Sequence, residues 1–181
     1  MGGFKWLHFL DLHFSMQDSF DTGLARQSLL ECLAREKLAC DYVFITGDIA
    51  NQNDYSAAKE FVTELLSRVK VDAQNVFWAV GNHDIKRGSK LRDSIIGNIR
   101  KAKDPAHEFE AAMADEEMRT ILTYSGMADY IQQYDLLFGR KLSAAEISDA
   151  HVYHPLEQCN LVVLNTCLTS CDNEDTHKLM H

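Results

Sequence analysis

Three short groups of polar residues each come directly after an apolar run in the first half of the chain. The first group, Asp11-Leu12-His13, follows residues 4–10. The second, Gly47-Asp48, follows residues 42–46, and the third, Gly81-Asn82-His83-Asp84, follows residues 76–80. A carboxylate, an imidazole and a carboxamide contribute little to packing at the end of a strand, but all three can bind metal ions. Each group alone is common in turns. The ordered set indicates a metal-assisted phosphate site.

The carboxyl ends of neighbouring strands would bring these groups together, because ligands of open α/β sheets bind in the crevice outside those ends. Side chains two residues apart on a strand point the same way, so Asp11 and His13 could hold one cation. Asp48 has two carboxylate oxygens and could bridge two ions. Mixed oxygen and nitrogen ligands suit Mn, Fe or Zn better than Ca. Two such ions, ~3.5–4 Å apart, can clamp a phosphoryl group and activate a water molecule.

Strands and helices alternate over the first 84 residues. Strands are predicted over residues 4–10, 42–46 and 76–80, with Trp6 and Trp78 as candidates for the core. Strands that alternate with helices imply right-handed crossovers and a mostly parallel sheet. The predicted fold class is therefore α/β, in layers built from βαβ units.

The two helices between these strands have recognisable starts. Asp21 or Thr22 could cap a helix that runs to about residue 37, and leucines recur along it. Asn53 or Asp54 could cap the next helix, in which apolar residues recur at helical spacing to residue 69. Both helices would cover the sheet with their apolar faces.

Residues 85–150 have a different character, with helical patterns over residues 89–103, 106–122, 126–138 and 143–149. We expect a helical insertion over one edge of the sheet, within a single domain that covers residues 1–181. Basic residues gather at its start: Lys86, Arg87, Lys90, Arg92, Arg100, Lys101 and Lys103. They are interpreted as a solvated helix face, with attraction of anionic substrates as the alternative. Strands are expected again at residues 152–153 and 161–165.

Composition narrows the function. The chain has 181 residues and a net charge of −9, which argues against a general nucleic-acid binder because that affinity depends on Lys and Arg. No apolar run approaches the ~18 residues of a membrane span, so no membrane partner is expected. The five cysteines lack zinc-type pairs and are interpreted as reduced thiols, which predicts a cytoplasmic protein.

The ordered set D-x-H, G-D and G-N-H-D, each behind a predicted strand, resembles the calcineurin-like metallophosphoesterase superfamily. The segment from Gly47 to Asn51 is followed by Asp54-Tyr55 and a predicted helix. It is more similar to the branch of class III cyclic-nucleotide phosphodiesterases than to the nuclease branch. The resemblance covers residues 4–84 well, residues 151–166 loosely and the insertion not at all. It implies a layered sandwich of the metallophosphoesterase type, of which this chain forms the N-terminal part.

The resemblance also implies roles for the metal ligands. Asp11 and His13 would bind the first of two divalent ions (Mn, Fe or Zn). Asp48 would bridge both ions, and Asn82 would bind the second.

Two further roles follow from the resemblance. His83 would not be a metal ligand; it would contact the phosphate and protonate or stabilise the leaving oxygen. Asp84 would orient His83 and favour its protonated state. Gly47 and Gly81 would let the backbone turn sharply beside the ions.

The sequence departs from the family pattern in its second half. Family members carry further histidines downstream, including a G-H-x-H pair, and this sequence contains no G-H-x-H; His177 and His181 lie in the right direction but not in a matching context at the end of a strand. We therefore expect the chain to be incomplete at its C-terminus. The second half of the sandwich would come from a C-terminal segment or a partner chain.

These observations predict a metallophosphoesterase that hydrolyses a phosphodiester or a phosphomonoester through a dimetal-activated water, acting on a small phosphoester or a nucleotide. The alternative is a non-catalytic protein-binding module that retains the fold with a weakened metal site, because the downstream histidines are missing. A nuclease is a third hypothesis, and the acidic balance weighs against it.

Overall fold

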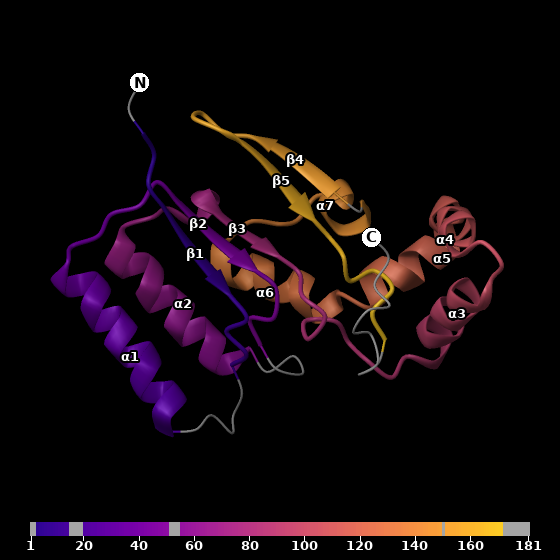
Figure 1. Ribbon diagram of the computed structural model, residues 1–181, viewed down its shortest axis with the longest axis horizontal. Coiled ribbons are helices and arrows are strands. Elements are labelled where there is room, and N and C mark those ends of the chain that lie inside the picture. The colour runs from indigo at the N-terminus through magenta and orange to yellow at the C-terminus, as the bar shows by residue number, and fades with distance from the viewer. Residues whose placement is uncertain (1–2, 15–19, 51–54, 150, 172–181) are drawn as a thin grey trace.

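A parallel three-stranded sheet forms the centre of the molecule (Figure 1). The computed structural model describes residues 3–14, 20–50, 55–149 and 151–171. Strands β1 (Trp6–Leu10), β2 (Tyr42–Thr46) and β3 (Val76–Ala79) lie in the order β1-β2-β3, and both pairings are parallel. The predicted α/β class is confirmed, and β2 has the predicted bounds.

The described helices, in chain order, are α1 (Phe20–Arg35), α2 (Ser56–Val69), α3 (Lys90–Lys101), α4 (Pro105–Ala114), α5 (Glu116–Thr120), α6 (Ala128–Phe138) and α7 (Ala144–Ser148). Two short turns of other types are η1 (Ala73–Asn75) and the π-helical η2 (Ile121–Ser125).

The helix starts differ from the predicted caps. Since α1 begins at Phe20, Asp21 and Thr22 lie in its first turn and not at its N-cap. Tyr55 occupies the N-cap of α2 without a capping side-chain hydrogen bond, and the predicted caps at residues 53–54 lie outside the described residues.

Helices α1, α2 and α6 cover one face of the sheet, and the main core lies beneath them (Figure 1). Trp78 on β3 is 2% exposed, as predicted, and its ring contacts Tyr55, Tyr130 and Tyr134. The Tyr130 hydroxyl donates a hydrogen bond to the Trp78 carbonyl at 2.6 Å. Helix α6, which belongs to the predicted insertion, is thus part of the main core.

The opposite face of the sheet looks onto a groove of about 540 Å³. Its walls include Trp6, Phe44 and Phe77 from the sheet, and residues of an antiparallel hairpin, β4 (His151–Pro155) and β5 (Asn160–Leu164). Trp6 was expected in the core, but it is 56% exposed. It points into this open groove because its side chain lies on the face of β1 away from the helices.

The rest of the insertion forms a small second core around Ile96, Ile99 and Leu122. The helical pattern predicted over residues 106–122 divides at Asp115, whose carboxylate caps α5 by accepting a hydrogen bond from the Met118 N–H at 2.8 Å. The expected solvated face of basic residues is wrong at one position, since Arg92 is 0% exposed.

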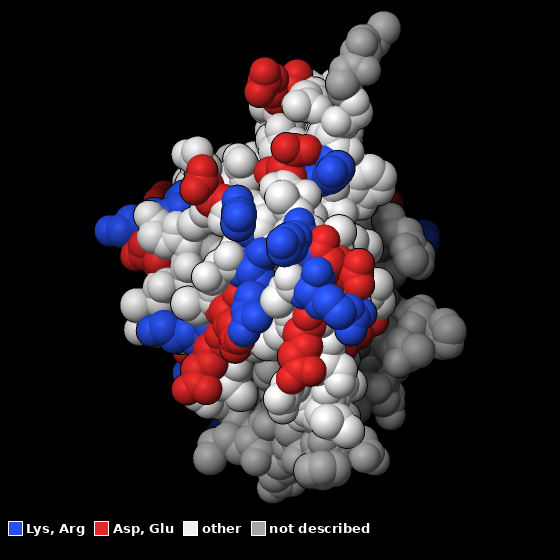
Figure 2. All heavy atoms as spheres, turned by 90° about the vertical axis from the view of Figure 1, so that its left-hand side faces the viewer, with Lys and Arg blue, Asp and Glu red and all other residues white. Residues whose placement is uncertain are grey.

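None of the described helices is both long and apolar enough to cross a membrane. The face on the α1 side of the molecule carries basic and acidic side chains interspersed (Figure 2). This view shows no broad basic surface of the kind that tracks a nucleic-acid backbone.

Candidate metal centre

The loops after β1, β2 and β3 meet at one edge of the sheet, as predicted. The loops after β1 and β2 continue side by side beyond the strands, with a parallel bridge between Phe14 and Ala50. The His13 N–H donates to the Asp48 carbonyl at 2.8 Å. The loop after β2 is joined to β3 by the Gly47 N–H, which donates to the Ala79 carbonyl at 2.9 Å. Backbone hydrogen bonds therefore fix the loops relative to one another.

Three of the predicted ligands adopt left-handed backbone conformations. The φ angles are 50° at Asp11, 45° at His13 and 44° at Asp48. Such angles cost of order 1–3 kcal/mol each in residues other than glycine, and they cluster at functional sites. The expectation was that strand alternation would point the side chains of Asp11 and His13 the same way. That is wrong, because β1 ends at Leu10 and both Asp11 and His13 have left-handed backbones. Their directions come from the loop.

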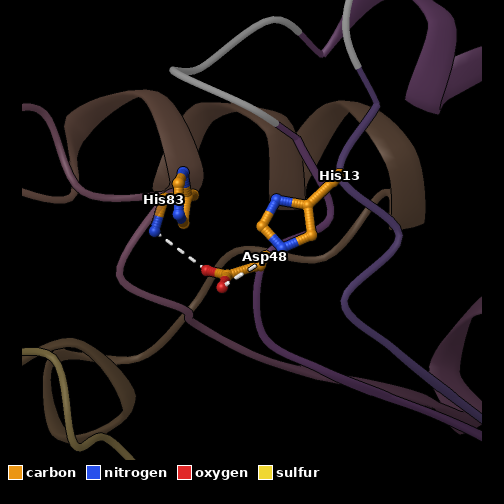
Figure 3. Close-up of side chains that lie close together, drawn as sticks. All are labelled: His13, Asp48 and His83. Carbon is orange, nitrogen blue, oxygen red and sulfur yellow. Dashed lines mark hydrogen bonds and ion pairs between the residues drawn. The ribbon is translucent and has the colours of Figure 1, made fainter. Parts of the chain in front are cut away.

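The side chains of His13, Asp48 and His83 gather at this edge (Figure 3). His13 Nε2 is 3.8 Å from Asp48 Oδ2, and the backbone N–H of His83 donates to Asp48 Oδ1 at 2.8 Å. One ligand atom from each residue lies within 4.8 Å of the other two. Ligands on opposite sides of one ion are separated by about two ~2.1 Å bonds, so a small closing movement would let the three share a cation.

Asn82 lies beside the same carboxylate. One terminal atom of its amide is 3.2 Å from Asp48 Oδ2, and the other is 3.3 Å from Nη2 of Arg87. With the amide nitrogen toward Asp48, both contacts are hydrogen bonds. With the amide oxygen toward Asp48, two oxygens face each other, and a cation between them would relieve their repulsion. The second orientation is the one that a metal ligand would take.

Asp11 is exposed at the rim of this cluster. Its carboxylate is not among the three ligand atoms that lie within 4.8 Å of one another, but it is close enough for its charge to favour protonation of His83. Partial burial lowers the pKa of His83 overall, Asp48 and Asp11 oppose that effect, and His13 and Arg87 add to it. Asp11 remains a predicted ligand.

Asp84 points inward, where it is 0% exposed. Its Oδ2 accepts from the Gly81 N–H at 2.9 Å, and its Oδ1 accepts from the Tyr55 hydroxyl at 3.2 Å. Burial raises the pKa of Asp84 to about 7, and these hydrogen bonds oppose the increase. Among the described residues, neither oxygen of Asp84 has a recorded hydrogen bond to His83. The carboxylate supports the turn that carries His83, and its orienting effect on the ring stays a prediction.

Gly81 allows this turn to pass directly over Asp48. A Cβ atom at Gly81 would lie 2.2 Å from both the backbone nitrogen and Oδ1 of Asp48, closer than any non-bonded contact. Gly47 has a φ angle of 74°. A Cβ atom at Gly47 would lie 3.3 Å from the Cα of Gly81. The two loops therefore approach each other through their glycines.

Two neighbours of the site were not singled out from the sequence. Tyr55 was quoted only as part of the family resemblance. Its neighbours in sequence give no sign of a role, because its hydroxyl meets Asp84 only in the folded structure. Arg87 was grouped with the basic cluster of the insertion. Its place three residues after Asp84, in the same loop, was the signal available.

The fold and this edge of the sheet define an α/β protein with a His-Asp-His cluster suited to a metal ion. The sequence matches the calcineurin-like phosphoesterase family over residues 5–172, and the chain belongs to this family. The resemblance drawn from the motifs is confirmed at the level of the superfamily. The match runs across residues 85–150, where the motifs showed no likeness.

Among curated proteins, the chain is similar to the uncharacterized metallophosphoesterase-like protein YydB of Bacillus subtilis (strain 168). The two are 29% identical over 170 residues, which cover 92% of this chain and 34% of that protein. The chain therefore spans about a third of the length of this relative.

Proposed function

We propose that the chain is the metal-binding part of a phosphoester hydrolase. One observation carries the proposal: two expected ligands, His13 and Asp48, and the imidazole of His83 come from three loops that are far apart in the sequence, and one polar atom of each lies within 4.8 Å of the other two. Imidazole and carboxylate ligands in this combination suit Mn, Fe or Zn. Membership of the calcineurin-like phosphoesterase family supports the reaction class.

The proposed ligand set keeps the order expected from the motifs. Asp11 and His13 would hold one divalent ion, Asp48 would lie between two, and Asn82 would hold the second. The contact between the Asn82 amide and Asp48 Oδ2 supports the last assignment. When bound, the ions would supply Lewis acidity for a water nucleophile and neutralise charge on the phosphoryl oxygens.

His83 is proposed to contact the phosphoryl group and the leaving oxygen. Its backbone N–H is held by Asp48, so the base of the side chain is fixed beside the ligands while the ring remains partly exposed. Burial lowers the pKa of this imidazole and the neighbouring carboxylates oppose that effect. An imidazole in this place can donate a proton to a leaving oxygen or accept one from it. Asp84 holds the turn beneath it.

The proposed substrate is a small phosphodiester or phosphomonoester, such as a nucleotide, with the diester favoured by the resemblance to the class III phosphodiesterase branch. The net charge of −9 and the mixed charges of Figure 2 weigh against a long nucleic acid. We propose a cytoplasmic location, since an odd number of cysteines without zinc-type pairs is typical of reduced thiols.

The groove between the sheet and the hairpin supports a further partner. Trp6, Val162 and Leu164 line it and each expose more than half of their surface, and a contiguous apolar patch of this kind is normally covered. A C-terminal segment or a partner chain that adds strands would fill the groove. It would complete the sandwich of the single domain that residues 1–181 form in part. The proposal is supported by the length of the relative, of which this chain covers 34%.

The test is metal-dependent turnover of bis(p-nitrophenyl) phosphate by the chain with added Mn²⁺, against the same protein in chelator and against Asp48→Asn. Turnover that needs Mn²⁺ and is lost in Asp48→Asn supports the hydrolase. Stoichiometric Mn²⁺ binding with no turnover favours the non-catalytic binding module instead. Absence of Mn²⁺ binding by the folded chain overturns the metal centre itself.

A further inference from the structure

Arg92, on α3, is a fully buried cation in the insertion. Its guanidinium donates to three backbone carbonyls: Nε to Leu122 at 3.3 Å, Nη2 to Leu168 at 2.9 Å, and Nη1 to Ser170 at hydrogen-bond distance. Burying a guanidinium is costly unless its donors are satisfied. The three carbonyls offset this cost, at a position where an apolar residue would be the default.

The three carbonyls belong to two segments that are separate in the sequence. Leu122 lies in η2, and the other two carbonyls lie in the buried segment of residues 167–170 that follows β5. Gly126, directly after η2, lies against the same guanidinium, and a Cβ there would be 2.6 Å from Arg92 Nε. One side chain therefore joins α3, the end of η2 and the segment after β5.

Both segments hold the loop of the candidate metal centre. The Cys167 thiol, one residue before Leu168, contacts the Val80 carbonyl at 3.6 Å. The Lys86 N–H donates to the Gly126 carbonyl at 2.8 Å. The loop of residues 80–86, which carries Asn82 and His83, is thus held at one end by Gly126, which lies against the Arg92 guanidinium, and at the other by Cys167, the residue before its carbonyl partner Leu168.

We propose that Arg92 is a positioning residue for the metal centre: it fixes residues 80–86, and so sets the places of Asn82 and His83 relative to Asp48. The inference rests on the proposed function for its link to metal binding. It assigns the insertion a task in the site, although none of the predicted ligands lies in it. Small displacements of this loop matter because the residues that orient ligands contribute about 10- to 100-fold to metal affinity.

The experiment compares Arg92→Lys with Arg100→Lys in the full chain. Arg100 lies on the same helix and donates to Thr169, in the same segment, at 2.8 Å. Arg100→Lys therefore shows what weakening an arginine contact with this segment does when Arg92 is intact. A lysine keeps the charge of either arginine but cannot reach three diverging carbonyls with a planar fork.

Two quantities are measured: the Mn²⁺ dissociation constant by calorimetry, and hydrogen–deuterium exchange of the peptide that covers residues 80–86. For Arg92→Lys we expect an increase of about 10-fold or more in the dissociation constant and faster exchange in that peptide. Arg100→Lys should change both by less than about threefold. Gly126→Ala, which displaces the guanidinium without removing it, should act in the same direction as Arg92→Lys.

The outcomes separate the inference from the proposed function. If both lysine variants lower the thermal midpoint equally and leave Mn²⁺ affinity and exchange at residues 80–86 unchanged, Arg92 is merely structural and the inference is wrong. If the wild-type chain binds no Mn²⁺, the proposed function fails, and the exchange measurement alone still decides whether Arg92 fixes the loop. If Arg92→Lys does not fold, Gly126→Ala decides by the same two measurements.

Discussion

Gly81→Ala is the substitution whose effect follows most directly from the geometry. The new methyl carbon would lie 2.2 Å from the backbone nitrogen and Oδ1 of Asp48, and 2.8 Å from its Cγ. Rotation of the Asp48 side chain cannot relieve the overlap with the backbone nitrogen. The loop after β2 and the loop after β3 must move apart, and the hydrogen bond from the His83 N–H to Asp48 Oδ1 is lost.

The magnitude has two contributions. Forcing one extra carbon into a packed site costs about 1–3 kcal/mol, and a hydrogen bond to a charged group contributes about 1.5–3 kcal/mol. Since the two overlap in part, we expect the free energy of unfolding to fall by about 2–5 kcal/mol. Mn²⁺ affinity should fall as well, because Asp48 and Asn82 no longer approach each other.

The assay is urea unfolding in chelator, followed by circular dichroism, with Mn²⁺ calorimetry on the same samples. The matched control is Gly97→Ala inside α3, where nothing lies within 4 Å of the added Cβ. That variant should gain about 0.5–1 kcal/mol, because alanine favours a helix interior over glycine. Wild-type stability and Mn²⁺ affinity in Gly81→Ala would refute the close approach of the two loops.

Three further predictions follow. His83→Gln should lower turnover of the Mn²⁺-loaded chain by about 10²–10⁴-fold if the ring acts as general acid, with metal content by elemental analysis near wild type; loss of both would make His83 a ligand instead. Burial raises the pKa of Asp84 from its usual 3.8 to about 7, so between these values the folded state holds a proton that the unfolded state has lost. The free energy of unfolding in chelator should therefore decrease as the pH rises from 4 to 7, by on the order of 4 kcal/mol. Asp84→Asn should flatten that slope in urea titrations across the range, and an unchanged slope would mean that another group titrates. Trp78→Ala should cost about 3–5 kcal/mol and Trp6→Ala less than about 1 kcal/mol in urea unfolding; equal costs would show that the groove is filled in solution.

The alternation of strands and helices in residues 4–84 was predictable because local patterns decide it. Residues 42–46 are apolar and β-branched or aromatic, and β2 has those bounds. The meeting of the three polar groups at one edge followed from the parallel sheet alone. Trp6 was misplaced because the pattern of a strand does not say whether anything covers each of its faces, and here one face looks onto the groove.

Arg92 could not be placed correctly for a related reason. A basic residue on a predicted helix is solvated by default, and only the packing of η2 and residues 167–170 against Arg92 provides carbonyls for a buried guanidinium. The contacts of Asp84 were equally out of reach, because the fold of the loop decides that its carboxylate accepts hydrogen bonds from Gly81 and Tyr55. Its effect on His83 stays a prediction.

The left-handed backbones of Asp11, His13 and Asp48 bear on whether the ligands are in place before a metal ion binds. Strain at Asp11, His13 and Asp48 persists only if the surrounding structure over-determines it, and here the Phe14–Ala50 bridge and the His13-to-Asp48 backbone hydrogen bond join two of the loops through their backbones. Asp48 is further fixed from the third loop by the His83 N–H. A cluster held by the backbone in this way is preorganised, so metal binding would spend little free energy on ordering the ligands. It follows that stability gained on adding Mn²⁺ should reflect metal affinity through mass action, with little change in the exchange rates of the loops themselves.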